Sequence, residues 1–264
     1  MAAGLTGLSL RRALLGAALL AALPMGAMAE PVWVGRFPSE GNTLPTPWKV
    51  EQFDERIAPT RYTLRQWDGV AAVEAQAKKS MALLARPLNI DLQKTPILCW
   101  KWRIDAVIAS ADMTQKSGDD YTARVYLSFA IPPDQLAFGT RMKLKLGRAI
   151  FGHQVPDAAL NYVWDNKHPI GAVQDSAYTD RARLFVLRSG NGEAGAWVQE
   201  QRNVPQDLRR AFGEDEAKFA KLSGLAIATD TDNTGEEAHA GFADFRFVAN
   251  AAECAEPTNA KPSK

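Results

Sequence analysis

The sequence contains little cysteine and histidine and none of the common catalytic motifs. Its 264 residues include two cysteines and three histidines. His153, His168 and His239 are too far apart to form the His-x-His or His-Glu-x-x-His patterns of zinc sites. A Gly-x-Ser-x-Gly elbow, a Gly-x-Gly-x-x-Gly turn and a phosphate-binding loop are missing as well. We therefore expect neither a zinc enzyme nor one of the common hydrolase or nucleotide-binding sites.

Long apolar runs and an excess of one charge are absent too. No stretch after residue 30 reaches the roughly 20 uncharged residues that a membrane-spanning helix needs. Lysine and arginine together number 31 and aspartate and glutamate 30, so the net charge is +1. The sequence therefore predicts a protein that does not span a membrane and has no overall basic surface for nucleic acid.

Residues 1–29 have the features of an export signal. An arginine pair at positions 11 and 12 precedes an apolar run over 13–23, which ends in the small-residue pattern Ala-Met-Ala at 27–29. We expect cleavage after Ala29 and a soluble product in the periplasm or outside the cell. No cysteine lies in or just after the signal to accept a lipid anchor. The arginine pair leaves both general secretion and folded export open.

The remaining 235 residues carry a net charge of −1 and suit one domain. Residues 30–47 are rich in proline and glycine and are expected to form an extended segment. Residues 249–264 are polar and are expected to form a frayed tail. The domain itself is therefore predicted to span residues 48–248.

Alternation of apolar and polar residues with a period of two dominates this domain. It is clearest over 98–105 and 121–130, which predict half-buried strands. Weaker strand patterns cover residues 61–67, 70–76, 88–92, 143–146, 160–164, 182–188, 196–204, 222–229 and 241–248. Only residues 205–212 look helical, with Pro205 in the first turn and Gly213 as the cap. The sequence thus predicts an all-β fold, an antiparallel β-sandwich of jelly-roll type with one short helix.

A series of local sequence motifs resembles one protein family. The motifs are Trp48-Lys49-Val50-Glu51, Trp100-Lys101-Trp102, Gly118-Asp119-Asp120-Tyr121, Arg124-Val125-Tyr126, Tyr162-Val163-Trp164, Leu187-Arg188-Ser189-Gly190, Trp197 with Glu200, Arg202, Asn203 and Val204, Arg209-Arg210-Ala211-Phe212-Gly213, and Thr229-Asp230-Thr231-Asp232-Asn233-Thr234-Gly235. Together they resemble domain-of-unknown-function family 3047 over residues 48–248. The resemblance implies an exported bacterial protein with a sandwich similar to carbohydrate-binding and lectin-like domains. It brings no established activity and no catalytic residues.

Two strands offer a candidate ligand surface. Lys101 and Arg103 lie on the outer side of the first clear strand, and Arg124 and Tyr126 on the outer side of the second. If the strands are neighbours, these side chains form a basic, aromatic surface suited to sugars or anions. The alternative is a solvated sheet face with weak salt bridges. Further candidate ligand residues, which could equally be structural, are Trp164, Trp197 and Arg202.

One loop has the composition of a metal site. Asp230, Asp232 and Thr234 present oxygen atoms at alternate positions before a glycine, as in the first half of a calcium loop. The second half is missing, so a polar turn is the alternative. Asp119 and Asp120 are the expected partners if a structural calcium ion binds here.

The same carboxylates allow an enzymatic interpretation. Asp119, Asp120 and Glu200, assisted by Arg202, could act on a polysaccharide. Adjacent residues in a strand point to opposite faces, however, so we do not expect Asp119 and Asp120 to flank one bond. Structural roles in turns and ion pairs remain open for all of them.

The two cysteines, Cys99 and Cys254, could form a disulfide in an oxidising compartment, with two unpaired thiols as the alternative. Three functions remain in view. The first is a non-catalytic module that binds an envelope or extracellular glycan. The second is a polysaccharide-acting enzyme, and the third is a structural partner of another envelope protein. The sequence does not fix the oligomeric state.

Overall fold

The computed structural model describes residue 1 and residues 29–41, 43–151 and 155–255. Residues 2–28 of the predicted signal peptide, His153 and the last nine residues of the predicted tail therefore lie outside the described residues. No described helix is long and apolar enough to cross a membrane.

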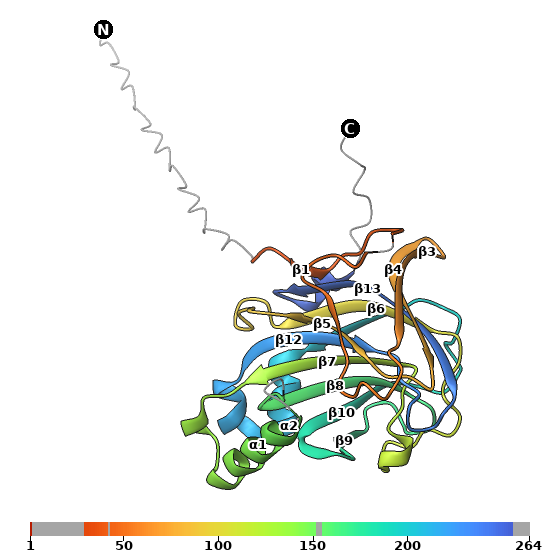
Figure 1. The fold of residues 1–264 in the computed structure, drawn as a ribbon. Helices are drawn as coiled ribbons and strands as arrows, with labels where there is room; N and C mark the ends of the chain where they lie inside the picture. Colours follow the sequence, from red (N-terminus) through yellow and green to blue (C-terminus); the bar gives the residue numbers. More distant parts are fainter. Residues whose placement is uncertain (2–28, 42, 152–154, 256–264) are drawn as a thin grey trace.

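Two β-sheets pack face to face and confirm the predicted all-β sandwich (Figure 1). The six-stranded sheet has the order β11-β6-β13-β4-β3. Strand β1 pairs with the second half of β13, on the side where β4 no longer pairs with it. The seven-stranded sheet has the order β2-β5-β12-β7-β8-β10-β9. The strands are β1 Val32–Gly35, β2 Lys49–Glu51, β3 Arg61–Trp67, β4 Val70–Lys78, β5 Leu83–Pro87, β6 Ile97–Ile104, β7 Ala123–Ala130, β8 Ala158–Asp165, β9 Val173–Ser176, β10 Thr179–Ser189, β11 Val198–Asn203, β12 Lys221–Ala228 and β13 Glu237–Val248.

The inward faces follow the predicted alternation. In β6, Leu98, Trp100, Trp102 and Ile104 are fully buried between the sheets. Their large rings meet those of the opposite sheet: Trp100 stacks on Tyr162 at 5.5 Å between ring centroids. Each such ring removes a large apolar area from water, so this layer stabilises the packing of the two sheets against each other.

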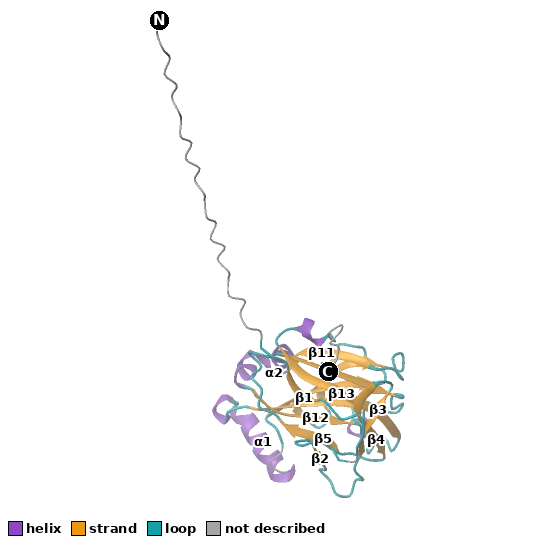
Figure 2. Cartoon of the chain, turned by 90° about the horizontal axis from the view of Figure 1, so that it is seen from above, coloured by secondary structure: helices purple, strands orange, loops and turns teal. Residues whose placement is uncertain are grey.

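Two α-helices cover one end of the sandwich, where the sequence predicted only one (Figure 2). Helix α2, Val204–Phe219, begins as expected, because the Asn203 side chain accepts a hydrogen bond from the Gln206 amide at 3.0 Å. Gly213 interrupts it at a φ of 83°, a conformation that glycine adopts without strain, and the chain then continues as helix.

Three predicted details of the fold are wrong. Residues 143–146 were expected to form a strand but lie within helix α1, Phe138–Phe151, because their Lys-Leu-Lys-Leu alternation is too short to separate the two periods. The strand expected at 88–92 lies earlier, as β5. The sandwich is also not wholly antiparallel, since β10 pairs with β8 in parallel.

The predicted disulfide is present and anchors the start of the predicted tail. Cys99 and Cys254 are bonded, with their Cα atoms 5.6 Å apart. Residues Ala251–Cys254 form a short 3-10 helix, and Cys254 is buried with Ile97 and Val248. The first residues after β13 are therefore docked rather than frayed, because a covalent bond and a small apolar cluster hold them.

Candidate functional site

The predicted basic surface does not form as one face. Lys101 and Arg103 lie on β6 of the six-stranded sheet, whereas Arg124 and Tyr126 lie on β7 of the seven-stranded sheet. The outer sides of these strands face away from each other across the sandwich. The condition for a shared surface, that the two strands are neighbours, is therefore not met.

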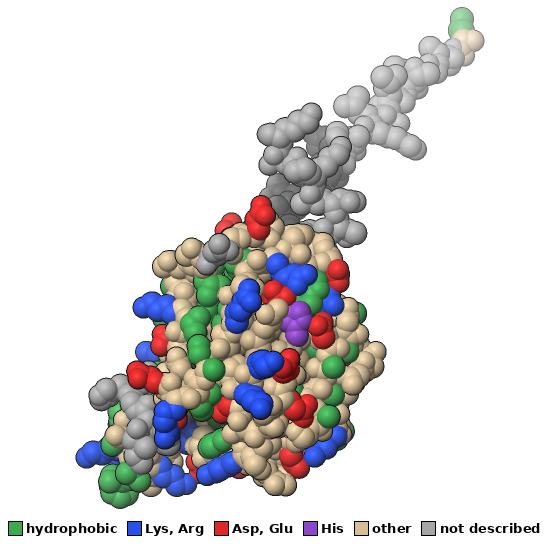
Figure 3. All heavy atoms as spheres, turned by 45° about the vertical axis from the view of Figure 1, so that its right-hand side comes forward, with side chains coloured by type: hydrophobic (Ala, Val, Ile, Leu, Met, Phe, Trp, Pro, Cys, Tyr) green, Lys and Arg blue, Asp and Glu red, His purple; other side chains and the backbone are tan. Residues whose placement is uncertain are grey.

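The outer face of the six-stranded sheet contains a network of ion pairs and rings. On the side of the molecule drawn in Figure 3, basic and acidic side chains lie beside one another. Arg103 lies over the Trp67 ring at 4.1 Å and pairs with Asp68, and Lys101 pairs with Asp244 at 3.3 Å. Trp197 donates from Nε1 to the Trp67 carbonyl oxygen at 2.8 Å. These side chains already have partners within the chain, so this face needs no ligand to explain it.

The sequence-predicted residues Arg124 and Trp164 are buried. The Arg124 side chain is 4% exposed, and its Nη1 donates to Asp230 Oδ2 at 2.6 Å. Asp119 Oδ2 lies 3.7 Å from Arg124 Nη2. Tyr126 is half-buried, with the Arg124 guanidinium 4.8 Å from its ring. Trp164 is 1% exposed and belongs to the core, so Arg124 and Trp164 hold the fold together.

Beside Arg124, three of the predicted metal ligands come together. One carboxylate oxygen from each of Asp120, Asp230 and Asp232 lies within 4.8 Å of the others. Asp120 also accepts hydrogen bonds from the Asn233 amide at 3.3 Å and the Thr234 amide at 2.6 Å. The loop turn and the carboxylate cluster, which the sequence offered as alternatives, are thus parts of one structure.

The two other predicted ligands have different contacts. Asp119 lies on the Arg124 side of the cluster, and its buried Oδ1 has no hydrogen-bond partner among the described residues. The Thr234 hydroxyl accepts from the Glu236 amide at 3.4 Å. The structure therefore groups three of the five predicted metal residues and leaves Asp119 as a neighbouring carboxylate.

The cluster concentrates negative charge in a partly dry place. Burial, which disfavours the charged form, raises the pKa of Asp230 to about 7 despite Arg124, and Asp120 and Asp119 add to this rise. Burial and Asp120 likewise raise the pKa of Asp232. Oxygen ligands from carboxylates suit Ca²⁺, which would neutralise this repulsion by binding Asp120, Asp230 and Asp232.

We predict that calcium stabilises the folded protein through this cluster. In the metal-free folded protein, Asp230 keeps its proton up to a pH of about 7, whereas in the unfolded chain the same group loses its proton at a lower pH. The stability that this difference in pKa provides is therefore lost as pH rises through about 7. At a hundredfold excess over Kd, calcium should raise the free energy of unfolding by about 2.7 kcal/mol. Thermal melting with calcium and with EDTA at pH 8 measures the effect.

The Asp232→Ala variant should abolish the calcium effect while leaving the metal-free protein folded, because Asp232 is half-buried and is not part of the Arg124 ion pair. Equal melting temperatures of the wild-type protein in EDTA and in calcium would contradict the prediction.

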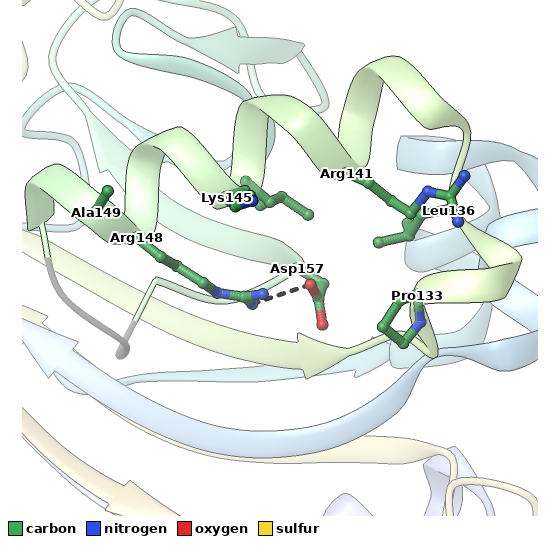
Figure 4. A pocket seen from close by; sticks show the side chains of 8 residues that line it. Pro133, Leu136, Arg141, Lys145, Arg148, Ala149 and Asp157 are labelled. Carbon is green, nitrogen blue, oxygen red and sulfur yellow. Dashed lines mark hydrogen bonds and ion pairs between the residues drawn. The ribbon is translucent and has the colours of Figure 1, made fainter.

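A cavity of about 510 Å³ lies between α1 and the start of β8 (Figure 4). Arg148 crosses it to pair with Asp157 at 2.9 Å. Arg141 and Lys145 also line it, and neither lies within ion-pair distance of a carboxylate among the described residues. The cavity is basic, and among the residues that line it only Asp157 has a side chain that can accept a hydrogen bond from a sugar; Arg148 and the Ile131 amide already bind this carboxylate.

A second cleft, of about 310 Å³, lies between the two sheets. It opens between β10 of the seven-stranded sheet and β11 of the six-stranded sheet, whose outer edge has no strand partner among the described residues. The residues that line it are Ile170, Gly171, Phe185, Val186, Leu187, Arg188, Glu200, Gln201, Arg202 and Arg210. Three guanidinium groups, one carboxylate and an apolar floor therefore converge on one opening.

Glu200 is the buried acid of this cleft. Its Oε1 accepts from Arg188 Nε at 2.7 Å and from Trp102 Nε1 at 3.1 Å. Burial raises the pKa of Glu200, although Arg188 and Trp102 favour the charged form. A carboxyl group with a raised pKa in a cleft is a recurrent feature of functional sites.

The other two arginines differ in what neutralises them. Arg202 forms a two-point ion pair with Asp207, whose Oδ2 also accepts from the Tyr162 hydroxyl at 2.8 Å. Arg210 donates to the Gly171 carbonyl oxygen at 3.2 Å, and no carboxylate among the described residues lies within ion-pair distance. The cleft thus contains a cation available to an anionic ligand.

Sequence reasoning found part of this cleft. It named Arg202 as a ligand residue and Glu200 as a possible catalytic acid, and the structure brings both to one opening. It missed Arg188 and Arg210 as site residues, although both lie in motifs that carry the family resemblance. The available signal was the charge of Arg188 at the end of the strand predicted over 182–188 and the charge of Arg210 in the helix predicted over 205–212.

Comparison with known proteins identifies the family. A family model described as "Protein of unknown function (DUF3047)" matches residues 46–246. The chain belongs to this family. The match includes all thirteen strands except β1 and the last residues of β13, and it includes both sides of the cleft, so the cleft is part of the DUF3047 region.

Several solved structures resemble the DUF3047 chain weakly. A family 30 carbohydrate-binding module is 9% identical, with 90% of this chain and 91% of that chain covered and a TM-score of 0.33. The xyloglucanase domain of NopAA, a type three effector from Sinorhizobium fredii, is 8% identical, with 77% and 93% covered and a TM-score of 0.37. No curated protein matches the chain. These likenesses are too weak to indicate what the DUF3047 chain binds.

Proposed function

We propose that this protein is an exported, non-catalytic module that binds an envelope or extracellular glycan in the cleft between β10 and β11. The observation that carries the proposal is Arg210, a guanidinium at the opening with no carboxylate partner among the described residues. Export rests on the features of residues 1–29.

The chemistry of the cleft fits an acidic sugar. A guanidinium binds a carboxylate through two parallel hydrogen bonds, so Arg210 suits the carboxylate of a uronic acid. Glu200 and Gln201 offer acceptors for hydroxyl groups, and Arg202 offers donors. The exposed side chain of Ile170 provides apolar surface for the carbon face of a sugar ring, and Phe185 lies buried beneath the opening.

The composition of the cleft favours binding over hydrolysis. Glycosidases use two carboxyl groups on either side of the scissile bond, about 5 to 9.5 Å apart. Glu200 is the only carboxylate among the residues that line the cleft, and Arg188 and Trp102 already bind it. The enzyme that the sequence left open would need a second carboxylate from outside the cleft.

The proposal predicts that the mature protein, purified from the periplasmic fraction and beginning at Glu30, binds acidic oligosaccharides on a glycan array and binds neutral ones less. Arg210→Ala should weaken the binding of uronate-containing oligosaccharides about tenfold or more, because a hydrogen-bonded ionic contact contributes about 1.5–3 kcal/mol. Isothermal titration calorimetry measures the affinity.

Arg209→Ala is the matched control. Arg209 is the neighbouring residue in α2, its pair with Glu214 is exposed, and it does not line the cleft. Its removal should leave the affinity unchanged. An array without any bound glycan, or an equal loss of affinity for the two variants, would contradict the proposal. Turnover of a bound oligosaccharide that Glu200→Gln abolishes would favour the enzyme instead.

A further inference from the structure

Helix α1 has an apolar face that points away from the protein. Phe138, Met142 and Leu146 are 71%, 49% and 63% exposed, whereas Leu144 alone of the helix's leucines is buried against the core. At about 100° per residue, the three exposed side chains share one sector of roughly 80°. Three large apolar groups in a row at i, i+4 and i+8 form a continuous stripe rather than scattered exposure.

Basic side chains flank this stripe on both sides. By the same helical spacing, Lys143 lies on one side, and Arg141 and Lys145 lie on the other. The helix sequence contains four basic residues and no acidic one. All three flanking residues are exposed, and Lys143 has only an exposed partner, Asp180, at 2.7 Å.

The cavity beneath the helix extends this basic surface. Arg141 and Lys145 line the cavity of about 510 Å³, and neither has an ion-pair partner among the described residues (Figure 4). Figure 2 shows α1 at the outside of the molecule, beside the sheets and not between them. The exposed stripe therefore lies on the outside of the molecule, where a flat partner can contact it.

We propose that α1 docks this protein on the surface of an anionic phospholipid bilayer. Helices that lie in the membrane interface combine a stripe of large apolar residues with lysine and arginine beside it, and both contribute to binding. Lysine and arginine stems lie along the apolar region while their charges reach the phosphate groups. The absence of acidic residues from α1 favours anionic lipid over a neutral apolar partner.

Flotation with lipid vesicles tests this inference. The wild-type protein should float with vesicles of equimolar phosphatidylcholine and phosphatidylglycerol, should bind vesicles of phosphatidylcholine alone about tenfold more weakly, and should lose binding in high salt. The triple variant Phe138→Ser, Met142→Ser, Leu146→Ser and the double variant Lys143→Glu, Lys145→Glu should each reduce the bound fraction about tenfold. Circular dichroism of each variant checks that the fold is intact.

Phe53→Ser is the matched control, because Phe53 is 51% exposed and lies outside α1. It should bind anionic vesicles as the wild-type protein does. Wild-type protein that fails to bind anionic vesicles, or variants that bind normally, would overturn the inference. Loss of a dimer by the triple variant without vesicle binding would overturn it in favour of self-association. Glycan binding by the cleft is measured separately, and neither result depends on the other.

Discussion

Replacement of Arg124 by methionine should lower the free energy of unfolding by about 3–5 kcal/mol. Removal of one partner of a buried ion pair leaves the other charge buried and uncompensated. Arg124 is 4% exposed and its partners Asp230 and Asp119 are 3% and 8% exposed, so two carboxylates would lose their counter-charge. Urea denaturation followed by tryptophan fluorescence measures the change.

The pH dependence and a second variant separate this effect from simple loss of packing. Unpaired Asp230 can be neutralised by a proton at low pH, so the loss should be larger at pH 8 than at pH 5. Asp230→Asn added to Arg124→Met should recover part of the stability. Lys78→Met, at an exposed pair with Glu237, should cost less than about 1 kcal/mol. A loss for Arg124→Met no larger than that of Lys78→Met would be inconsistent with a buried, paired charge.

Removal of the disulfide should have the second large effect. The bond closes a loop of 155 residues, and the chain-entropy model gives about 4–5 kcal/mol for so long a loop. The double variant Cys99→Ala, Cys254→Ala should therefore unfold at a markedly lower urea concentration with an altered denatured state. Equilibrium unfolding of both proteins measures the difference.

Thiol counting provides the control for this prediction. Unfolded wild-type protein that has not been reduced should contain no reactive thiol, because Cys99 and Cys254 are the only cysteines of the chain. Two reactive thiols per chain, or a double variant as stable as the wild-type protein, would show that the bond does not hold the segment after β13.

The sandwich could be predicted because its two clearest strands alternate strictly. In β6 and β7 every second residue is apolar over eight residues, and this period alone specifies an inward and an outward face. The sequence could not show which strands are neighbours, because pairing depends on contacts between distant segments. For that reason a common surface for Lys101 and Arg124 depended on the condition that their strands are neighbours, and the structure places them on different sheets.

The candidate sites were predictable to different degrees. Asp230 and Asp120 are separated by 110 residues, yet their shared chemistry was sufficient to suggest that they meet, and they do. Burial of Arg124 on the outer side of β7 could not be foreseen, because the loop that carries Asp230 covers it. The cleft likewise depends on how close β10 and β11 come to each other, which no local pattern encodes.

Calorimetric titration of a uronate-containing oligosaccharide into the wild-type protein, Arg210→Ala and Arg209→Ala is the most direct test of the proposed glycan-binding cleft. The account predicts saturable binding to the wild-type protein and to Arg209→Ala, with an affinity at least about tenfold lower for Arg210→Ala. The same affinity for all three proteins, or no binding by a correctly folded wild-type protein, would contradict it.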